Sequence, residues 1–208
     1  MDMLLPGSWP ARPTVTLLVA MLVATVGACG SKPTLTYQAS RVVAAHGTVQ
    51  VAPFVYVPAE RGEVKSDQSQ VQGAPRRGEQ FDPDVDVFIT DATAAYLEAS
   101  GISVRESATQ QLTGNIETFA LDFGGKRHEV EAVVDIDFFL TEGADTVYQY
   151  TASSRKMYKW TIGSESYETM LGEIAQRCIQ MFLVEAKAAG VFSGGDSEVD
   201  PILFDVAP

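Results

Sequence analysis

Few side chains in this chain of 208 residues are of types that catalyse reactions or bind metal ions. The sequence has two cysteines, Cys29 and Cys178, and two histidines, His46 and His128, which lie far apart, each beside a predicted turn. The sequence contains none of the motifs of zinc proteases, redox dithiols, phosphate-binding loops or hydrolase nucleophile elbows. With so few ligands and no nucleophile–base pair, we predict no metal site, no cofactor and no enzymatic activity.

Cys29 is notable for what precedes it. Residues 14–27 form an uncharged run that follows Arg12, and this run is too short to span a bilayer, which takes roughly 20 apolar residues. Its length is typical of a signal-peptide core. The four residues VGAC at 26–29 resemble a bacterial lipobox, which implies cleavage after Ala28 and acylation of the Cys29 thiol. Ordinary signal-peptidase cleavage after Ala28 is the alternative, but it leaves the cysteine unexplained.

The expected lipidation of Cys29 predicts that the protein is located in the bacterial cell envelope. The net charge of −12 makes nucleic acid and anionic lipid poor partners, so the acyl chains must anchor the protein to the membrane. Gly30 follows the cysteine, where an aspartate commonly retains Gram-negative lipoproteins in the inner membrane. That resemblance implies the periplasmic face of the outer membrane. The outer face of the inner membrane and the soluble periplasm are the alternatives.

The chain divides into four predicted parts. Residues 1–28 are the signal peptide, 29–47 the lipid anchor and tether, 48–190 a single periplasmic domain and 191–208 a C-terminal tail. Apolar periodicity predicts one helix that opens at Asp82-Pro83 and is capped by Gly101, and a longer helix over 164–190. The predicted strands cover 48–57, 102–105, 112–123, 129–140 and 146–156. We therefore expect an α+β two-layer sandwich, with a mainly antiparallel sheet of about five strands and two helices packed on one face.

Two features predict where a partner protein binds. Residues 129–140 alternate, and the face that carries their acidic residues also carries Val133 and Phe139, apolar side chains that are typical of a partner-binding surface. Acids on one face also resemble the catalytic pair of a glycoside hydrolase, but a solvated face explains them. Residues 58–82 form a long predicted loop with Arg76 and Arg77, which is either a mobile insertion or a second partner-binding element.

Three further acids, Asp82, Asp84 and Asp86, have the spacing of calcium ligands in a helix–loop–helix site. Val87 stands where that loop needs glycine, and Thr93 where it needs glutamate. We interpret the three acids as the start of a helix, where negative charge interacts favourably with the helix dipole. No calcium site is expected.

The order of elements is similar to that of the YajG-like and ABC-transporter-auxiliary lipoproteins of Gram-negative bacteria. The resemblance rests on the segments VQVAPFVYV, AAYLEASGISV, LTGNIETFALDF, VVDIDFFL and VYQYTASS, followed by an amphipathic helix. It covers residues 49–189, and the loop over 58–82 departs from it. The resemblance implies a compact domain on the periplasmic side of a membrane without an active site. Only Cys29 maps onto a residue with a defined role.

The predicted function is that of a non-catalytic, lipid-anchored accessory or assembly component that binds another envelope protein, such as part of a transport system. The alternative is a periplasmic carrier that holds a lipid or small hydrophobic ligand between the sheet and the helices. Cys178 lies in the apolar stripe of the second helix and is expected to be a buried hydrophobic residue. The predicted lining of the carrier's site is Phe119, Phe123, Tyr148 and Tyr150.

Overall fold

The computed structural model describes residues 32–37, 42–73, 78–124, 128–159 and 166–193. The predicted signal peptide, with Ala28, and Cys29, Arg76 and Arg77 lie outside these residues. The chain divides into residues 1–31 and residues 32–208, and every described residue belongs to the second unit. None of the helices among the described residues has the length and apolar content that a membrane span requires.

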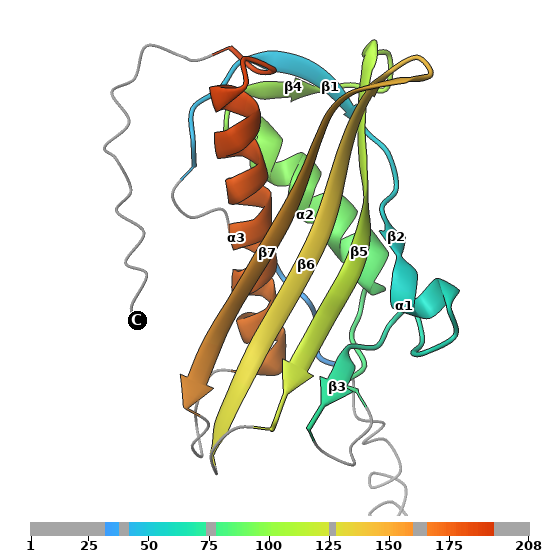
Figure 1. Ribbon diagram of the computed structural model, residues 1–208, viewed down its shortest axis with the longest axis vertical. Coiled ribbons are helices and arrows are strands. Elements are labelled where there is room, and N and C mark those ends of the chain that lie inside the picture. Colours follow the sequence, from blue (N-terminus) through green and yellow to red (C-terminus); the bar gives the residue numbers. More distant parts are fainter. Residues whose placement is uncertain (1–31, 38–41, 74–77, 125–127, 160–165, 194–208) are drawn as a thin grey trace, which may run out of the picture. The chain divides into compact units, whose positions relative to one another are not determined.

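Three long strands form the centre of the fold and position its exposed surface. β5 (Gln110–Asp122), β6 (Glu129–Glu142) and β7 (Asp145–Lys159) pair antiparallel as two successive hairpins (Figure 1). The second hairpin turns at Gly143, whose φ of 63° lies in the left-handed region that glycine adopts without strain. These strands confirm the alternation seen in the sequence, because residues of β6 are alternately buried and half-buried.

The short strands pair with their neighbours in parallel. β1 (Gly47–Val51), β2 (Val55–Tyr56) and β3 (Gln70–Gln72) all run parallel to β5, one after another along its edge. β4 (Ile102–Val104) runs parallel to β1, which gives the described residues a seven-stranded sheet with the main order β4-β1-β5-β6-β7. The α+β class is confirmed, but the prediction of a mainly antiparallel sheet of about five strands is wrong. The sheet is mixed because the segments before β5 extend it in parallel.

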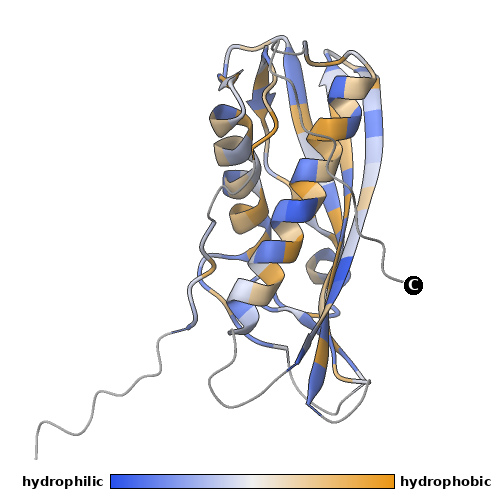
Figure 2. Ribbon diagram, turned by 90° about the vertical axis from the view of Figure 1, so that its left-hand side faces the viewer, coloured by the Kyte–Doolittle hydropathy of each residue, from blue (hydrophilic) through white to orange (hydrophobic). Residues whose placement is uncertain are grey.

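Two helices cover one face of this sheet, as predicted, and a third is a single turn. α2 (Val85–Ala99) and α3 (Tyr167–Ala188) pack on the face to which the buried residues of β6 point (Figure 1). The turn of helix α1 (Val57–Glu60) follows β2. Polar and apolar residues alternate along α3 with the period of an amphipathic helix (Figure 2).

Aromatic packing joins α3 to the sheet. The rings of Phe182 on α3 and Phe138 on β6 stack with centroids 4.6 Å apart, and both side chains are fully buried. Cys178 is also fully buried, and its Sγ donates a hydrogen bond to the Val134 carbonyl at 3.3 Å. Its predicted role as a buried hydrophobic residue is confirmed.

The start of α2 differs from the prediction. The helix begins at Val85 with Asp84 at the N-cap, not at Asp82-Pro83. Asp82 is held in extended backbone, because its N–H donates to the Pro33 carbonyl and its carbonyl accepts from the Leu35 N–H. Gly101, with φ of 94°, follows the helix as the predicted left-handed cap.

Described parts of the predicted loop, tether and tail belong to the fold. The predicted loop over 58–82 contains most of α1 and all of β3, and Gln68 forms an isolated bridge with Gln80. In the predicted tether, Leu35 and Ala45 are buried. In the predicted tail, Phe192 is buried and Ser193 bridges to His46. Isolated apolar residues in polar segments pack on the core here, without the periodicity that predicts a regular element.

Candidate interaction surface

The face of β5, β6 and β7 that the helices leave uncovered carries two of the predicted partner-binding residues, Val133 and Phe139. On β6 this face presents side chains that are all half-buried and alternate with fully buried ones on the opposite face. The set consists of Glu129, Glu131, Val133, Asp135, Asp137, Phe139 and Thr141. We call these residues and their cross-strand neighbours on β5 and β7 the open face.

Val133 and Phe139 both lie on the open face, but they do not form one apolar patch. They are six residues apart along β6, which corresponds to about 20 Å in an extended strand. Val133 lies opposite Ala120 on β5 and Arg155 on β7. Phe139 lies between polar residues of both neighbouring strands. Val133 and Phe139 are therefore separate apolar positions on a strand whose other open-face residues are mainly acidic.

The acids between these positions are bound to hydroxyl groups of β7. Thr151 Oγ1 donates to Asp137 Oδ1 at 2.6 Å, and Ser153 Oγ donates to Asp135 Oδ1. Both pairs lie directly opposite each other across the β6–β7 ladder. These hydrogen bonds favour a structural and surface role for the two carboxylates. Among the described residues, no group of three or more His, Cys, Asp or Glu side chains could hold a metal ion.

Strand β7 is an edge strand, which the sequence analysis did not recognise. It is 15 residues long, and in the described part of the chain it pairs only with β6. Val147 and Met157 on this strand are 47 % and 49 % exposed. An edge strand presents unpaired N–H and C=O groups and is commonly protected by lysine and other charges. The sequence signal that could have indicated an edge strand is the group of three basic residues near the end of β7: Arg155, Lys156 and Lys159.

A network of charged groups fastens β7 to α3 behind the open face. Lys156 Nζ contacts both carboxylate oxygens of Glu173 at 2.9 Å, and the Tyr158 hydroxyl donates to Glu173 Oε2 at 2.7 Å. Arg177 Nη2 adds an ion pair with Glu173 Oε1 at 3.4 Å. Burial alone raises the pKa of Glu173, but the hydrogen bonds from Lys156 and Tyr158 outweigh it and keep the pKa below its ordinary value. The carboxylate is therefore charged at neutral pH.

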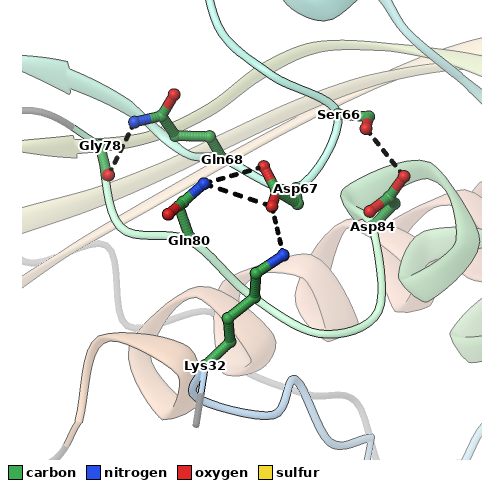
Figure 3. A network of polar contacts seen from close by, with 7 residues as sticks. All are labelled: Lys32, Ser66, Asp67, Gln68, Gly78, Gln80 and Asp84. Atoms are coloured by element: carbon green, nitrogen blue, oxygen red, sulfur yellow. Dashed lines mark hydrogen bonds and ion pairs between the residues drawn. The ribbon is translucent and has the colours of Figure 1, made fainter. Parts of the chain in front are cut away.

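A second polar network lies where the described chain begins, beside β3 (Figure 3). Lys32 Nζ forms an ion pair with Asp67 Oδ2 at 2.6 Å, and Gln80 Nε2 donates to the same carboxylate. Gln68 Nε2 donates to the Gly78 carbonyl at 2.9 Å. The hydrogen bond from Lys32 holds the pKa of Asp67 below its ordinary value. The network ties the start of the described chain to the segment between α1 and α2.

This segment also lines a shallow pocket of about 440 Å³. Its lining mixes charged, amide and hydroxyl side chains with the apolar side chains of Val64 and Val71. Among the described lining residues, the Ser69 hydroxyl accepts a hydrogen bond from the Glu79 backbone N–H at 3.2 Å. The polar lining residues are Glu63, Lys65, Gln68, Ser69 and Gln80, and Gly78 completes the lining.

The four aromatic residues predicted to line a carrier site pack against other side chains. The Phe119 ring is fully buried against Phe81, with centroids 6.1 Å apart. Phe123 contacts Tyr167 at 5.9 Å. Tyr148 contacts Phe182 at 6.2 Å, and Tyr150 is partly buried against the same core. Phe119 therefore belongs to the buried core, and the other three rings are partly buried against it.

Comparison with known proteins establishes a fold but no family. No protein-family model matches the sequence, and no curated protein matches it. A crystal structure from Xanthomonas campestris, of the family DUF330, has a TM-score of 0.57 and 13 % identity to this chain. The match covers 77 % of this chain and 99 % of that one, so the two share a fold.

Other matched structures are bacterial lipoproteins with lower scores. The minor lipoprotein of Acinetobacter baumannii has a TM-score of 0.38 at 10 % identity, covering 76 % of this chain and 100 % of its own. Rare lipoprotein B of Shewanella oneidensis has a TM-score of 0.38 at 12 % identity, covering 69 % of this chain and 96 % of its own. These scores are too low to establish a common fold. The resemblance to the YajG-like family in particular receives no support from a family model.

Proposed function

We propose that the protein is a non-catalytic lipoprotein of the bacterial cell envelope, anchored through acyl chains on Cys29, that binds another envelope protein. The observation that carries the proposal is the position of the lipobox-like residues 26–29. They end only three residues before Lys32, where the packed fold begins. A cysteine at the boundary between an apolar run and a folded domain suits lipid attachment, because it leaves the fold intact outside the membrane.

The fold shared with the DUF330 protein of Xanthomonas campestris is compatible with this role. Gly30 after the cysteine supports the periplasmic face of the outer membrane as the destination. The resemblance of the sequence to transporter-auxiliary lipoproteins supports a transport system as the partner.

The open face is the proposed binding surface for the partner protein. Asp135 and Asp137 on β6 lie between two apolar side chains, Val133 and Phe139, and the outer edge of β7 pairs with no strand in the described part of the chain. A matching partner surface carries basic groups opposite Asp135 and Asp137, with apolar side chains on either side. Arg76 and Arg77 remain a second proposed contact.

The anchor is tested by intact mass and detergent partition after expression in a Gram-negative host. The wild-type protein is expected to start at Cys29, to gain the mass of acyl chains and to enter the detergent phase. Cys29→Ala is expected to lose both properties, whereas Cys178→Ala keeps them, since Cys178 is buried in the fold. A wild-type product without the mass of acyl chains would contradict the proposal that the protein is a lipoprotein.

The partner surface is tested by photo-crosslinking in intact cells. A photoreactive amino acid at position 133 or 139 is expected to give one discrete adduct. The same amino acid at exposed Glu98 on α2 is expected to give none. Charge reversal at Asp135 and Asp137 is expected to remove the adduct, because it repels the proposed basic partner. Equal adducts from position 98, or adducts insensitive to charge reversal, would rule out the open face.

A further inference from the structure

The short connection between Cys29 and the fold limits the orientations that the domain can adopt on the membrane. Residues 32–37 are fixed to the domain and do not act as a flexible tether. Leu35 is 4 % exposed, and the backbone of Pro33 and Leu35 is hydrogen-bonded to Asp82 on both sides. The ion pair of Lys32 with Asp67, at 2.6 Å, extends this attachment to the first described residue.

The attachment lies at one end of the long strands. Asp67 is three residues before β3, and β3 pairs with the last residues of β5, from Ala120 to Asp122. At the same end β6 begins and β7 finishes, since Glu129 pairs with Lys159. Figure 1 shows β3 beside the end of β5, and the end of β7 lies at the same end of the sheet, on its other side. The hairpin turn at Gly143 lies at the opposite end of these strands, roughly 45 Å away for strands of this length.

Three residues of extended chain span at most about 11 Å. The acylated Cys29 lies at the membrane surface, so Lys32 cannot lie farther than this from the lipid headgroups. We propose that the end of the domain formed by Lys32, Asp67 and the last residues of β5 and β7 faces the bilayer. The turn at Gly143 then points away from it into the periplasm. The occupant of this surface is the lipid headgroup layer, and the proposal rests on the acylation of Cys29 proposed above.

The attachment also orients the open face. The strands run between the membrane-facing end and the distal turn, so the open face stands along the membrane normal and is accessible from the side. Val133 lies closer to the membrane-facing end of β6 and Phe139 closer to the distal end. A partner that spans both positions must therefore extend away from the bilayer.

The proposal is tested by energy transfer from single labelled cysteines to headgroup-labelled lipid. The full acylated protein is reconstituted in vesicles of phosphatidylethanolamine and phosphatidylglycerol, with a fluorophore on Lys159→Cys or on Ala144→Cys. Both positions are exposed, and they lie at opposite ends of β7. Acylation blocks Cys29 and burial protects Cys178, so the introduced thiol is the one that reacts.

Transfer is expected to be several-fold stronger from position 159 than from position 144. A matched variant with ten Gly and Ser residues inserted between Ser31 and Lys32 is expected to lose most of this difference. Equal energy transfer from both positions overturns the orientation. It is also overturned if the difference between positions 159 and 144 is unchanged in the variant with the inserted Gly and Ser residues. Intact mass is measured first. A protein without acyl chains contradicts the proposed function, whereas an acylated protein with equal transfer contradicts the orientation alone.

Discussion

Two adjacent phenylalanines on β6 provide a direct test of which side chains form the core. Phe138 is fully buried, with its ring stacked on Phe182 and edge-on to Phe54 at 5.7 Å. Phe139 is half-buried on the open face, opposite Thr113 and Gln149. The two residues have the same side chain on the same strand, so their alanine variants differ only in environment.

Phe138→Ala is expected to lower the free energy of unfolding by about 3–5 kcal/mol, because it removes a buried ring and leaves a cavity that the stacked aromatic neighbours cannot fill. Phe139→Ala is expected to cost about 1–2 kcal/mol, because water replaces the lost ring and only partial burial is lost. Both values are compared with a total stability of about 5–15 kcal/mol for a typical domain. The buried variant alone therefore removes a large part of the stability.

The assay is a urea titration followed by circular dichroism in the Cys29→Ala background, which needs no detergent. A lower midpoint with an unchanged slope reports lost stability. A larger loss for Phe139→Ala than for Phe138→Ala would refute the reasoning, because a one-residue shift in register exchanges the two faces of a strand. Equal losses would show that a partner or a second copy covers the open face under the conditions of the assay.

Three further variants test other contacts. The pKa of Glu173 is lowered in the fold, so its charge stabilises the fold above its ordinary pKa and stops doing so as pH falls through the folded value. The urea midpoint of wild type should exceed that of Glu173→Gln at about pH 7, and this advantage should disappear as the pH falls through the lowered pKa of Glu173; a constant difference would contradict the network. Cys178, buried and with its pKa raised by burial, should react with maleimide in urea but not in buffer. Gly114→Ala brings a Cβ into close contact with the Asp137 carbonyl oxygen, and its expected cost is about 1–3 kcal/mol; an unchanged midpoint would contradict this close approach.

The sequence predicted the elements whose pattern is local. Alternation along β6 separated the buried face from the face with Val133 and Phe139, and helical periodicity placed Cys178 in the core. The glycine cap at Gly101 was predicted from its type and position. These features depend on neighbours within a few residues, which is the range that sequence periodicity reports.

The remaining features depend on pairing between distant segments. The parallel pairing of β1, β2 and β3 with β5 joins segments some 50 to 60 residues apart, and no local pattern specifies it. Residues 32–37 are attached through the buried side chain of Leu35 and the ion pair of Lys32 with Asp67. These two contacts are too few to give a periodic pattern in the sequence. Two of the predicted interaction residues, Val133 and Phe139, share a surface, but strand geometry separates them. Cys29, Arg76 and Arg77 lie outside the described residues.

The dependence of β1, β2 and β3 on β5 imposes an order on folding. Residues 47–72 are synthesised before their partner strand, which is residues 110–122. The β5–β6–β7 hairpins close over short sequence separations and can form early, whereas parallel pairing of distant segments is slow. The first strands to arrive are thus the last to pair. Until β5 is in place they lack the strand with which they pair, and unpaired strand edges favour aggregation, so residues 47–72 are the segment most exposed to aggregation during folding.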